Sequence, residues 1–231
     1  MILSNDCWLT DAEKLRCKKY VSGNCNEGEF CEKLFRLNSL YEQSNLPENK
    51  RRRMDLRIDS DGTDRDKFIQ LSDIEKNIVS FVREGKNLYL YSKICGNGKT
   101  EWSIRLLQAY FNHIWYMTDF GCHGLFLSVP SFFKYMKDNL FEGRDNNLYK
   151  NAENCELVVW DEVAIKTLTN YEHETLLNLL SSRISKGLSN IYTSNMNPSE
   201  LNEKLGERLY SRVINTSMLI QLNGKDKRGV C

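Results

Sequence analysis

The residues best suited to chemistry form a glycine-rich run, Gly96-Asn97-Gly98-Lys99-Thr100, between an apolar segment over 88–92 and a segment of helical periodicity over 99–118. Glycines let backbone N–H groups close around an oxyanion, and the N-terminus of the following helix favours negative charge. We therefore predict a loop that binds a nucleoside triphosphate. Its residues are Cys95, Gly96, Asn97, Gly98, Lys99 and Thr100, and Thr100 is also expected to hold Mg²⁺.

The loop departs from the full GxxxxGK[ST] pattern at one position. That pattern has its first glycine five residues before Gly98, and this chain has Lys93 there. The short string GxGKT is weak evidence by itself. The prediction therefore depends on the strand before the loop, the helix after it and an acidic partner motif elsewhere in the chain.

Two carboxylates supply the partner motif. Within the expected strand 156–160, residues 157–160 have the continuous hydrophobicity of a parallel strand buried on both faces, and Asp161 and Glu162 follow them. In a parallel sheet, ligands bind beyond the carboxyl ends of the strands. We expect Asp161 to bind Mg²⁺ and Glu162 to orient and deprotonate an attacking water.

Two further segments could complete a hydrolytic site. Asn195 follows an expected strand over 190–194, where a neutral amide can hold a water near a terminal phosphate. Arg208 and Arg212 are four residues apart and so share one helix face. Arginine at a subunit junction can stabilise transition-state charge on a neighbour's nucleotide. Taken singly, the two segments are typical of a turn and of a solvated helix face.

Positioning these residues requires alternating strands and helices. The sequence predicts an α/β P-loop fold in which five parallel strands are sandwiched by helices. The expected strands are 88–92, 124–129, 156–160, 190–194 and 217–222. The expected helices are 71–82, capped by Ser72 or Asp73, and 99–118, 131–140, 171–186 and 198–214. We divide the chain into a mainly helical N-terminal domain (1–45), a linker (46–68) and an ATPase domain (69–231).

Composition limits the classes of protein that remain. The 231 residues carry a net charge of +1, so overall charge does not predict nucleic-acid binding. No apolar run reaches the length of a membrane helix, and residues 1–6 lack the pattern of a secretory signal. We expect a cytoplasmic protein without membrane contact. In that compartment its eight cysteines are expected to be thiols or metal ligands.

Half of these cysteines, Cys7, Cys17, Cys25 and Cys31, lie near the N-terminus. Four sulfurs suit tetrahedral Zn²⁺, and so short a segment has little core of its own. The segment contains no CxxC pair. The alternatives of a zinc site and of reduced cysteines packed as small hydrophobes both stay open.

With these motifs in order, the chain resembles the AAA+ ATPases of the DnaC/DnaI type, which load the replicative helicase, in particular versions from phages and Gram-positive bacteria. The matching strings are GNGKT, VVWDE, TSN, LGERLYSRV and the closing GKDKR, within residues 71–228. The resemblance implies that Lys99 and Thr100 form the Walker A site and that Asp161 and Glu162 form the Walker B pair. It also implies that Asn195 is a sensor, that Arg212, or else Arg208, is an arginine finger acting in trans, and that a large C-terminal lid is absent.

The resemblance also implies partners. They are a hexameric replicative helicase, which the N-terminal domain binds, and single-stranded DNA. The chain is also expected to assemble with further copies of itself or with the helicase ring. In such proteins the helix after the second strand binds DNA, here through Phe132, Phe133, Lys134 and Lys137, and we expect one of the two phenylalanines to face the core. Two alternatives remain: a transposition-helper ATPase of the IstB type, and a nucleotide-gated helicase adaptor or inhibitor with little turnover.

Overall fold

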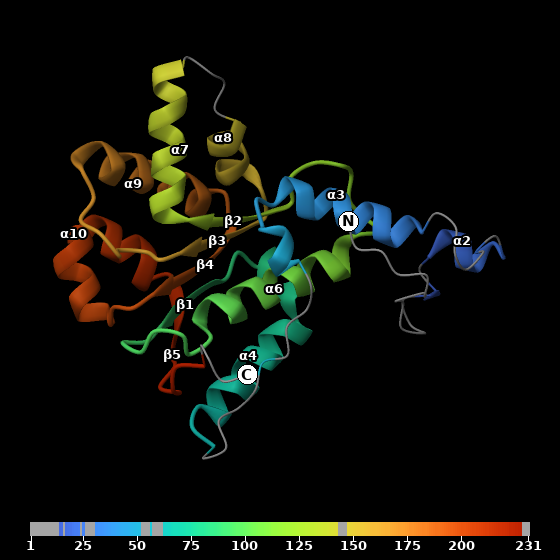
Figure 1. The fold of residues 1–231 in the computed structure, drawn as a ribbon, viewed down its shortest axis with the longest axis horizontal. Helices are drawn as coiled ribbons and strands as arrows, with labels where there is room; N and C mark the ends of the chain where they lie inside the picture. Colours follow the sequence, from blue (N-terminus) through green and yellow to red (C-terminus); the bar gives the residue numbers. More distant parts are fainter. Residues whose placement is uncertain are drawn as a thin grey trace.

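The computed structural model describes residues 14–15, 17–23, 25, 31–51, 56, 62–142 and 147–227. Its centre is a sheet of five parallel strands in the order β2-β3-β4-β1-β5 (Figure 1). The strands are β1 (Asn87–Tyr91), β2 (Gly124–Ser128), β3 (Leu157–Asp161), β4 (Ser189–Ser194) and β5 (Ser217–Gln221). Every boundary lies within one residue of the expected one, and the predicted P-loop fold class is confirmed.

Helices cover both faces of this sheet. They are α2 (Lys18–Val21), α3 (Glu32–Gln43), the 3₁₀ turn η1 (Glu48–Lys50), α4 (Arg65–Lys76), α5 (Ile78–Arg83), α6 (Lys99–Ile114), α7 (Val129–Glu142), α8 (Asn147–Asn154), α9 (Asn170–Ser185) and α10 (Pro198–Ile214). Figure 1 shows α7 to α10 on one side of the sheet and α3, α4 and α6 on the other.

Alternation along the strands divides the core into two hydrophobic clusters. Leu88 and Leu90 of β1 pack with the helices α3 to α6, whereas Tyr89, between them, packs with α7 to α10. Successive side chains of a strand point to opposite faces, so a continuous apolar run serves both clusters. Parallel pairing sets Leu88 beside Ile191 of β4 and Met218 of β5.

The helix expected over 71–82 is wrong in its bounds. Its residues belong to two helices, because α4 begins at Arg65 and the chain turns at Asn77 (φ −107°, ψ 22°) before α5. Ser72 and Asp73 therefore lie inside α4 and cap nothing. The residue before α4 is Asp64, at φ 64°, whose carboxylate accepts hydrogen bonds from the backbone N–H groups of Asn223 and Gly224. A contact this distant along the chain leaves no local signal.

The described part of the N-terminal region packs on the core. Leu37, Leu40 and Leu46 are buried in the same cluster as α6. Beyond α3, the Phe126 N–H of the edge strand β2 donates to Ser44 O at 2.8 Å. The domain boundaries at residues 45 and 68 stay predictions. None of the helices in the described residues has the length and apolar character needed to cross a bilayer.

Candidate functional site

The loop between β1 and α6 is shaped by two glycines and by one serine that the sequence reasoning missed. Gly96 (φ 72°) and Gly98 (φ 103°) take left-handed backbone angles, which cost a side-chain-bearing residue energy. Ser92 Oγ accepts from the Ile94 N–H at 3.0 Å and from Asn97 Nδ2 at 2.7 Å. The loop is therefore held in shape by its own polar groups.

Lys99 lies at the first position of α6 and is only 7% exposed. Its Nζ donates to Ile94 O at 2.9 Å and to Asn97 Oδ1 at 3.2 Å, both in the preceding loop. The ammonium group is thus folded back into the loop rather than extended into solvent. This arrangement concentrates positive charge at the helix N-terminus, where an anion is favoured.

The acidic motif reaches the same place. Thr100 Oγ1 donates to Asp161 Oδ1 at 2.8 Å, although the two residues are far apart in the sequence. Thr193 Oγ1, at the end of β4, donates to the same oxygen. Burial raises the pKa of the Asp161 carboxyl, while the hydrogen bonds from Thr193 and Thr100 lower it. The structure therefore brings the glycine-rich loop and Asp161 together in a buried, polar environment.

Glu162, the next residue, differs from Asp161 in its exposure. It is exposed and has a left-handed backbone (φ 61°), held by its own N–H donating to Thr193 Oγ1 at 3.2 Å. Ser128 Oγ, at the end of β2, donates to Glu162 Oε2 at 3.3 Å. A strained, solvent-facing carboxylate at the carboxyl edge is an arrangement often found at functional sites. The sequence analysis missed Thr193 as a site residue. The only signal for it was weak, namely its position two residues before Asn195.

Asn195 lies beside the loop. It is exposed, and its Nδ2 donates to Cys95 Sγ at 3.7 Å. Because β4 and β1 are neighbours in the sheet, residues just beyond their ends meet. The amide therefore lies beside the glycine-rich loop, and its role in holding a water near a phosphate stays a prediction.

The two arginines are placed differently. α10 is interrupted at Gly206 (φ 75°, ψ 160°), and Arg208 and Arg212 lie exposed on the segment after this kink. Arg212 Nε donates to Ser181 Oγ of α9 at 3.2 Å. α10 starts near the phosphate loop and ends just before β5, so the arginines lie toward its far end. In the described part of one chain, no hydrogen bond or ion pair joins either arginine to the loop.

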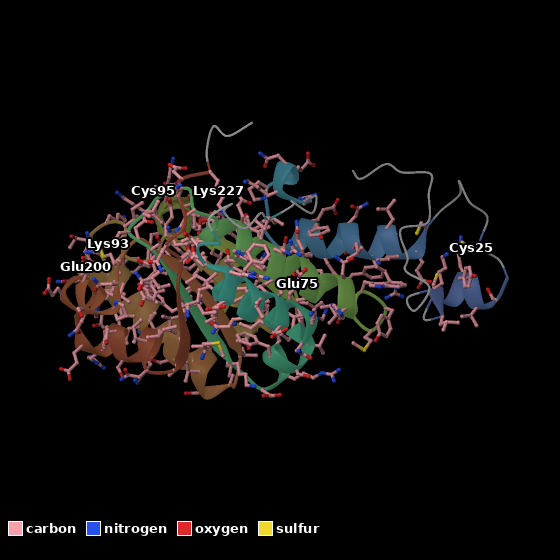
Figure 2. The ribbon with its side chains drawn as sticks, turned by 90° about the horizontal axis from the view of Figure 1, so that it is seen from below. Cys25, Glu75, Lys93, Cys95, Glu200 and Lys227 are labelled. Atoms are coloured by element: carbon pink, nitrogen blue, oxygen red, sulfur yellow. The ribbon has the colours of Figure 1, made fainter. Side chains whose placement is uncertain are left out.

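Two contacts cross the outside of the loop. Lys93, at the position of the missing glycine, pairs with Glu200 at the start of α10 through an Nζ–Oε1 distance of 2.7 Å. From the C-terminal segment, the Lys227 N–H donates to Gly96 O at 3.0 Å. Figure 2 shows Lys93 next to Glu200, and Lys227 near Cys95. Glu200 and the C-terminal segment were not part of the predicted site.

The predicted DNA helix is partly corrected. Phe132 and Phe133 are both buried, with exposed fractions of 2% and 3%, and their ring centroids lie 5.3 Å apart. The sequence analysis expects one of the two rings to face the core, and the structure buries both, because α7 is packed on Trp160 of β3 as well as on its neighbouring helices. Neither ring is exposed for stacking on a base. Lys134 and Lys137 are exposed.

The zinc hypothesis gains no support. Cys17 is buried, whereas Cys25 and Cys31 are exposed. Cys7 lies outside the described residues. Within the described ranges, no group of three or more histidine, cysteine, aspartate or glutamate side chains is arranged to hold a metal ion.

Comparison with known proteins shows the fold. No family model matches the chain, and no curated protein matches it either. Among solved structures, a DnaC helicase loader is 20% identical with a TM-score of 0.58, over 69% of this chain and 89% of the other. DnaI is 22% identical with a TM-score of 0.57, over 80% and 95% of the two chains.

A third similar structure is the replication initiator DnaA bound to AMPPCP and single-stranded DNA. It is 19% identical with a TM-score of 0.55, over 71% of this chain and 48% of DnaA. The chain therefore spans most of the length of the DnaC and DnaI structures and about half of DnaA. It shares its fold with these three structures.

Proposed function

We propose that this protein is an AAA+ ATPase that loads a hexameric replicative DNA helicase onto single-stranded DNA. The observation that carries the proposal is the 2.8 Å hydrogen bond between Thr100 Oγ1, at the start of α6, and Asp161 Oδ1, at the end of β3. It joins the two motifs that a nucleotide-hydrolysing site of this fold needs. The fold shared with DnaC and DnaI supports the loading role.

The side chains at this point suit a magnesium-bound ATP. Lys99 and the backbone N–H groups at the start of α6 would hold the phosphates. The Thr100 hydroxyl and the Asp161 carboxylate are hard oxygen ligands of the kind that Mg²⁺ takes. When bound, the ion would neutralise phosphate charge. Burial already disfavours the ionised form of Asp161, so a neighbouring cation would compensate that carboxylate.

Hydrolysis would use Glu162 as the general base and Asn195 as the group that holds the attacking water. Asn195 donates to Cys95 in the phosphate loop, which supports this assignment. We assign Arg212, with Arg208 as second candidate, to the nucleotide of a neighbouring subunit, because both are exposed on α10. An isolated subunit should then hydrolyse ATP slowly, since an arginine finger contributes a large rate factor.

ATP would act as a switch between states of assembly. Binding would favour a complex engaged with the helicase and DNA, and hydrolysis would release the helicase. The DnaA of similar fold was crystallised with AMPPCP and single-stranded DNA, which supports a nucleotide-dependent DNA contact. In this chain Lys134 and Lys137 are the candidates for contacts to DNA phosphates. Residues 1–45 are the proposed helicase-docking region.

A helicase-loading assay tests the proposal. The replicative helicase of the source cell is mixed with circular single-stranded DNA coated with single-strand-binding protein, and bound helicase is counted with and without this chain and ATP. We expect ATP-dependent loading by the wild type. Glu162→Gln should bind ATP but fail to release the helicase, whereas the exposed control Glu207→Gln should behave as wild type. ATP binding without any change in helicase occupancy would contradict the loading role.

The arginine assignment has its own experiment. Lys99→Ala and Arg212→Ala are each expected to abolish ATP turnover alone. Mixed together with helicase and DNA, they should recover part of it, because some junctions pair an intact loop with an intact Arg212. No recovery of ATP turnover at any mixing ratio would argue against an arginine finger acting in trans. Recovery when Arg208→Ala replaces Arg212→Ala in the mixture would assign the finger to Arg208.

A second candidate function is a nucleotide-gated helicase adaptor that turns over little ATP. The ion pair between Lys93 and Glu200 favours it, because it crosses the phosphate loop at the position where the full motif has glycine. Phosphate release in the presence of helicase and DNA separates the two candidates. A rate that Glu162→Gln does not lower would favour the adaptor.

A further inference from the structure

Two cysteines outside the proposed nucleotide site precede neighbouring strands: Cys122 lies two residues before β2, and Cys155 lies two residues before β3. Gly124 of β2 pairs with Leu157 of β3, and the Leu157 N–H donates to His123 O at 3.4 Å. Extending this register backwards by two residues sets Cys122 opposite Cys155. Adjacent strands are about 4.8 Å apart, and disulfide-bonded residues have Cα atoms about 4.4–6.8 Å apart. A strand spacing of this size is compatible with the Cα separation that a disulfide requires.

The two thiols have equivalent positions before their strands, because each contacts the carbonyl oxygen two residues further along the chain. Cys122 Sγ contacts Gly124 O at 3.8 Å, and also Gln43 O at 3.6 Å, and Cys155 Sγ contacts Leu157 O at 3.5 Å. Both are free thiols, and each shifts the pKa of the other. Cys155 is buried, whereas Cys122 is half-buried and so is the sulfur that a small oxidant can reach.

A buried guanidinium stands beside this pair. Arg183 is 0% exposed, and its Nη1 lies 4.0 Å from Cys155 Sγ. The other acceptors of Arg183 are neutral: Asn190 Oδ1 and the carbonyl oxygens of Ala152, Cys155 and Ser189. Since a buried charge is costly without an opposite charge, this environment favours a thiolate within the cysteine pair.

The titration of the two thiols is consistent with that arrangement. Burial raises the pKa of Cys155, but the hydrogen bond from Cys122 and the charge of Arg183 outweigh it and lower the pKa overall. The hydrogen bond to Cys155 and burial raise the pKa of Cys122. The directions of the two shifts favour the proton on Cys122 and the negative charge on Cys155.

We propose that Cys122 and Cys155 form an oxidation site that closes an intramolecular disulfide when it reacts with a hydroperoxide. Cys122 sulfur attacks the terminal oxygen, the O–O bond breaks, and the Cys122 proton passes to the Cys155 thiolate. The products are a sulfenic acid on Cys122 and an alkoxide, or hydroxide from hydrogen peroxide. Cys155 sulfur then displaces water from the sulfenic acid. The two sulfurs together lose two electrons, and the peroxide oxygen gains them.

This site is separate from the proposed nucleotide site. Cys155 precedes β3, whereas Asp161 ends it, so the pair and the phosphate loop lie at opposite ends of the sheet. The disulfide would join the segment before β2 to the end of α8 without touching the loop. Oxidation should therefore leave ATP binding unchanged, which makes the proposal independent of the proposed function.

Peptide mapping tests the proposal on the full chain. The protein is treated with hydrogen peroxide, alkylated and digested with trypsin, which places Cys122 in the peptide 106–134 and Cys155 in the peptide 151–166. We expect these two peptides linked, two hydrogens lighter than their sum, and separated again by dithiothreitol. The link should form at least about tenfold faster than oxidation of the exposed Cys31, because the guanidinium of Arg183 and a second thiol lie beside the reacting pair.

Variants separate the site from general thiol oxidation. Cys122→Ser should abolish the link and leave Cys155 alkylatable, while Cys95→Ser, which removes an exposed thiol elsewhere, should form the link as wild type does. Circular dichroism before oxidation checks that each variant is folded. If Cys155→Ser is not folded, the result for Cys122→Ser decides the test. Separate over-oxidation of the two cysteines, links to other cysteines, or covalent dimers in place of the internal link would each overturn the proposal.

Discussion

The two ends of the central sheet both bury charged side chains, but they hold them differently. At the amino end, Arg183 donates to Asn190 Oδ1 and to three backbone carbonyls contributed by α8, by the turn before β3 and by β4. At the carboxyl end, Lys99 donates to groups of its own loop, and Asp161 accepts from two threonine hydroxyls.

This difference indicates that the amino end holds a structural network and that the carboxyl end holds a candidate binding site. Asn190 links Arg183 to further side chains. Its Oδ1 also accepts from the indole N–H of Trp160, and its Nδ2 donates to Asn87 Oδ1. These partners belong to the sheet and its helices, so a ligand cannot replace them unless those elements unfold. The partners of Lys99 and Asp161 are a loop and short hydroxyls, which can give way to a ligand. We therefore expect changes at the amino end to alter stability and changes at the carboxyl end to alter binding.

The largest expected effect is that of Arg183→Met. It leaves several buried acceptors without their donor, so the free energy of unfolding should fall by about 3 kcal/mol or more. Urea denaturation followed by circular dichroism measures this, with the exposed Arg208→Met as a control that should change it by less than about 0.5 kcal/mol. Equal stability of the two variants would remove the distinction between the two ends.

Next in size is Lys99→Ala. Loss of a charged donor to phosphate should weaken ATP binding by about 10- to 100-fold, the range for a hydrogen bond to a charged group. Stability should change little, because the partners of Lys99 lie in its own loop. Calorimetric titration with MgATP measures the affinity, and Lys86→Ala, an exposed lysine just before β1, is the control. ATP binding by Lys99→Ala at wild-type strength would count against the proposed site.

Asp161→Asn should stabilise the protein while removing its ATP response. Burial raises the pKa of Asp161, so the folded state binds its proton more tightly than the unfolded state does. Stability of the wild type therefore falls as pH rises from the unfolded pKa of about 3.9 toward the raised folded pKa, above which the full cost is present.

The asparagine variant does not pay this cost and should be more stable at pH 7 by about 1 kcal/mol, a typical size for a point mutant. The advantage should shrink toward pH 4. Urea denaturation at several pH values measures it, with Glu162→Gln as the exposed neighbour for comparison. A variant less stable than wild type at pH 7 would show that Asp161 is a structural group like Arg183.

The smallest effect belongs to His123 at the amino end. Its hydrogen bonds to Glu156 and Asp119 raise its pKa to about 9 against the opposing effect of burial. The charged imidazole therefore contributes stability below the unfolded pKa of about 6.5, and this contribution is lost as pH rises through about 9.

His123→Gln should lower stability at pH 6 by less than about 1 kcal/mol, because both carboxylates are partly exposed and solvent screens the pairs. At pH 10 the variant and the wild type should agree. Thermal unfolding at the two pH values measures the difference, and a constant difference across this range would exclude the ion pairs as its cause.

The sequence predicts the sheet and the approach of its two motifs well for a physical reason. A strand buried on both faces must be continuously apolar, as residues 157–160 are. The two acids that follow them are expected at the carboxyl end of such a strand. The turn at Asn77 inside the expected helix 71–82 and the burial of both Phe132 and Phe133 were not predictable in this way. Each depends on which neighbouring elements pack against the segment, and helical periodicity does not specify that.

By itself, the sequence determined where the strands run and which glycines, acids and amide stand at their carboxyl ends, because these properties depend on residue order over a few positions. Only the tertiary structure decided that Thr193 joins Thr100 on Asp161, that Glu200 pairs with Lys93, and that Arg183 faces Cys155. Those contacts join residues on separate elements. Their energies depend on burial and on the distance between groups, which exist only once the sheet and its two layers of helices have assembled.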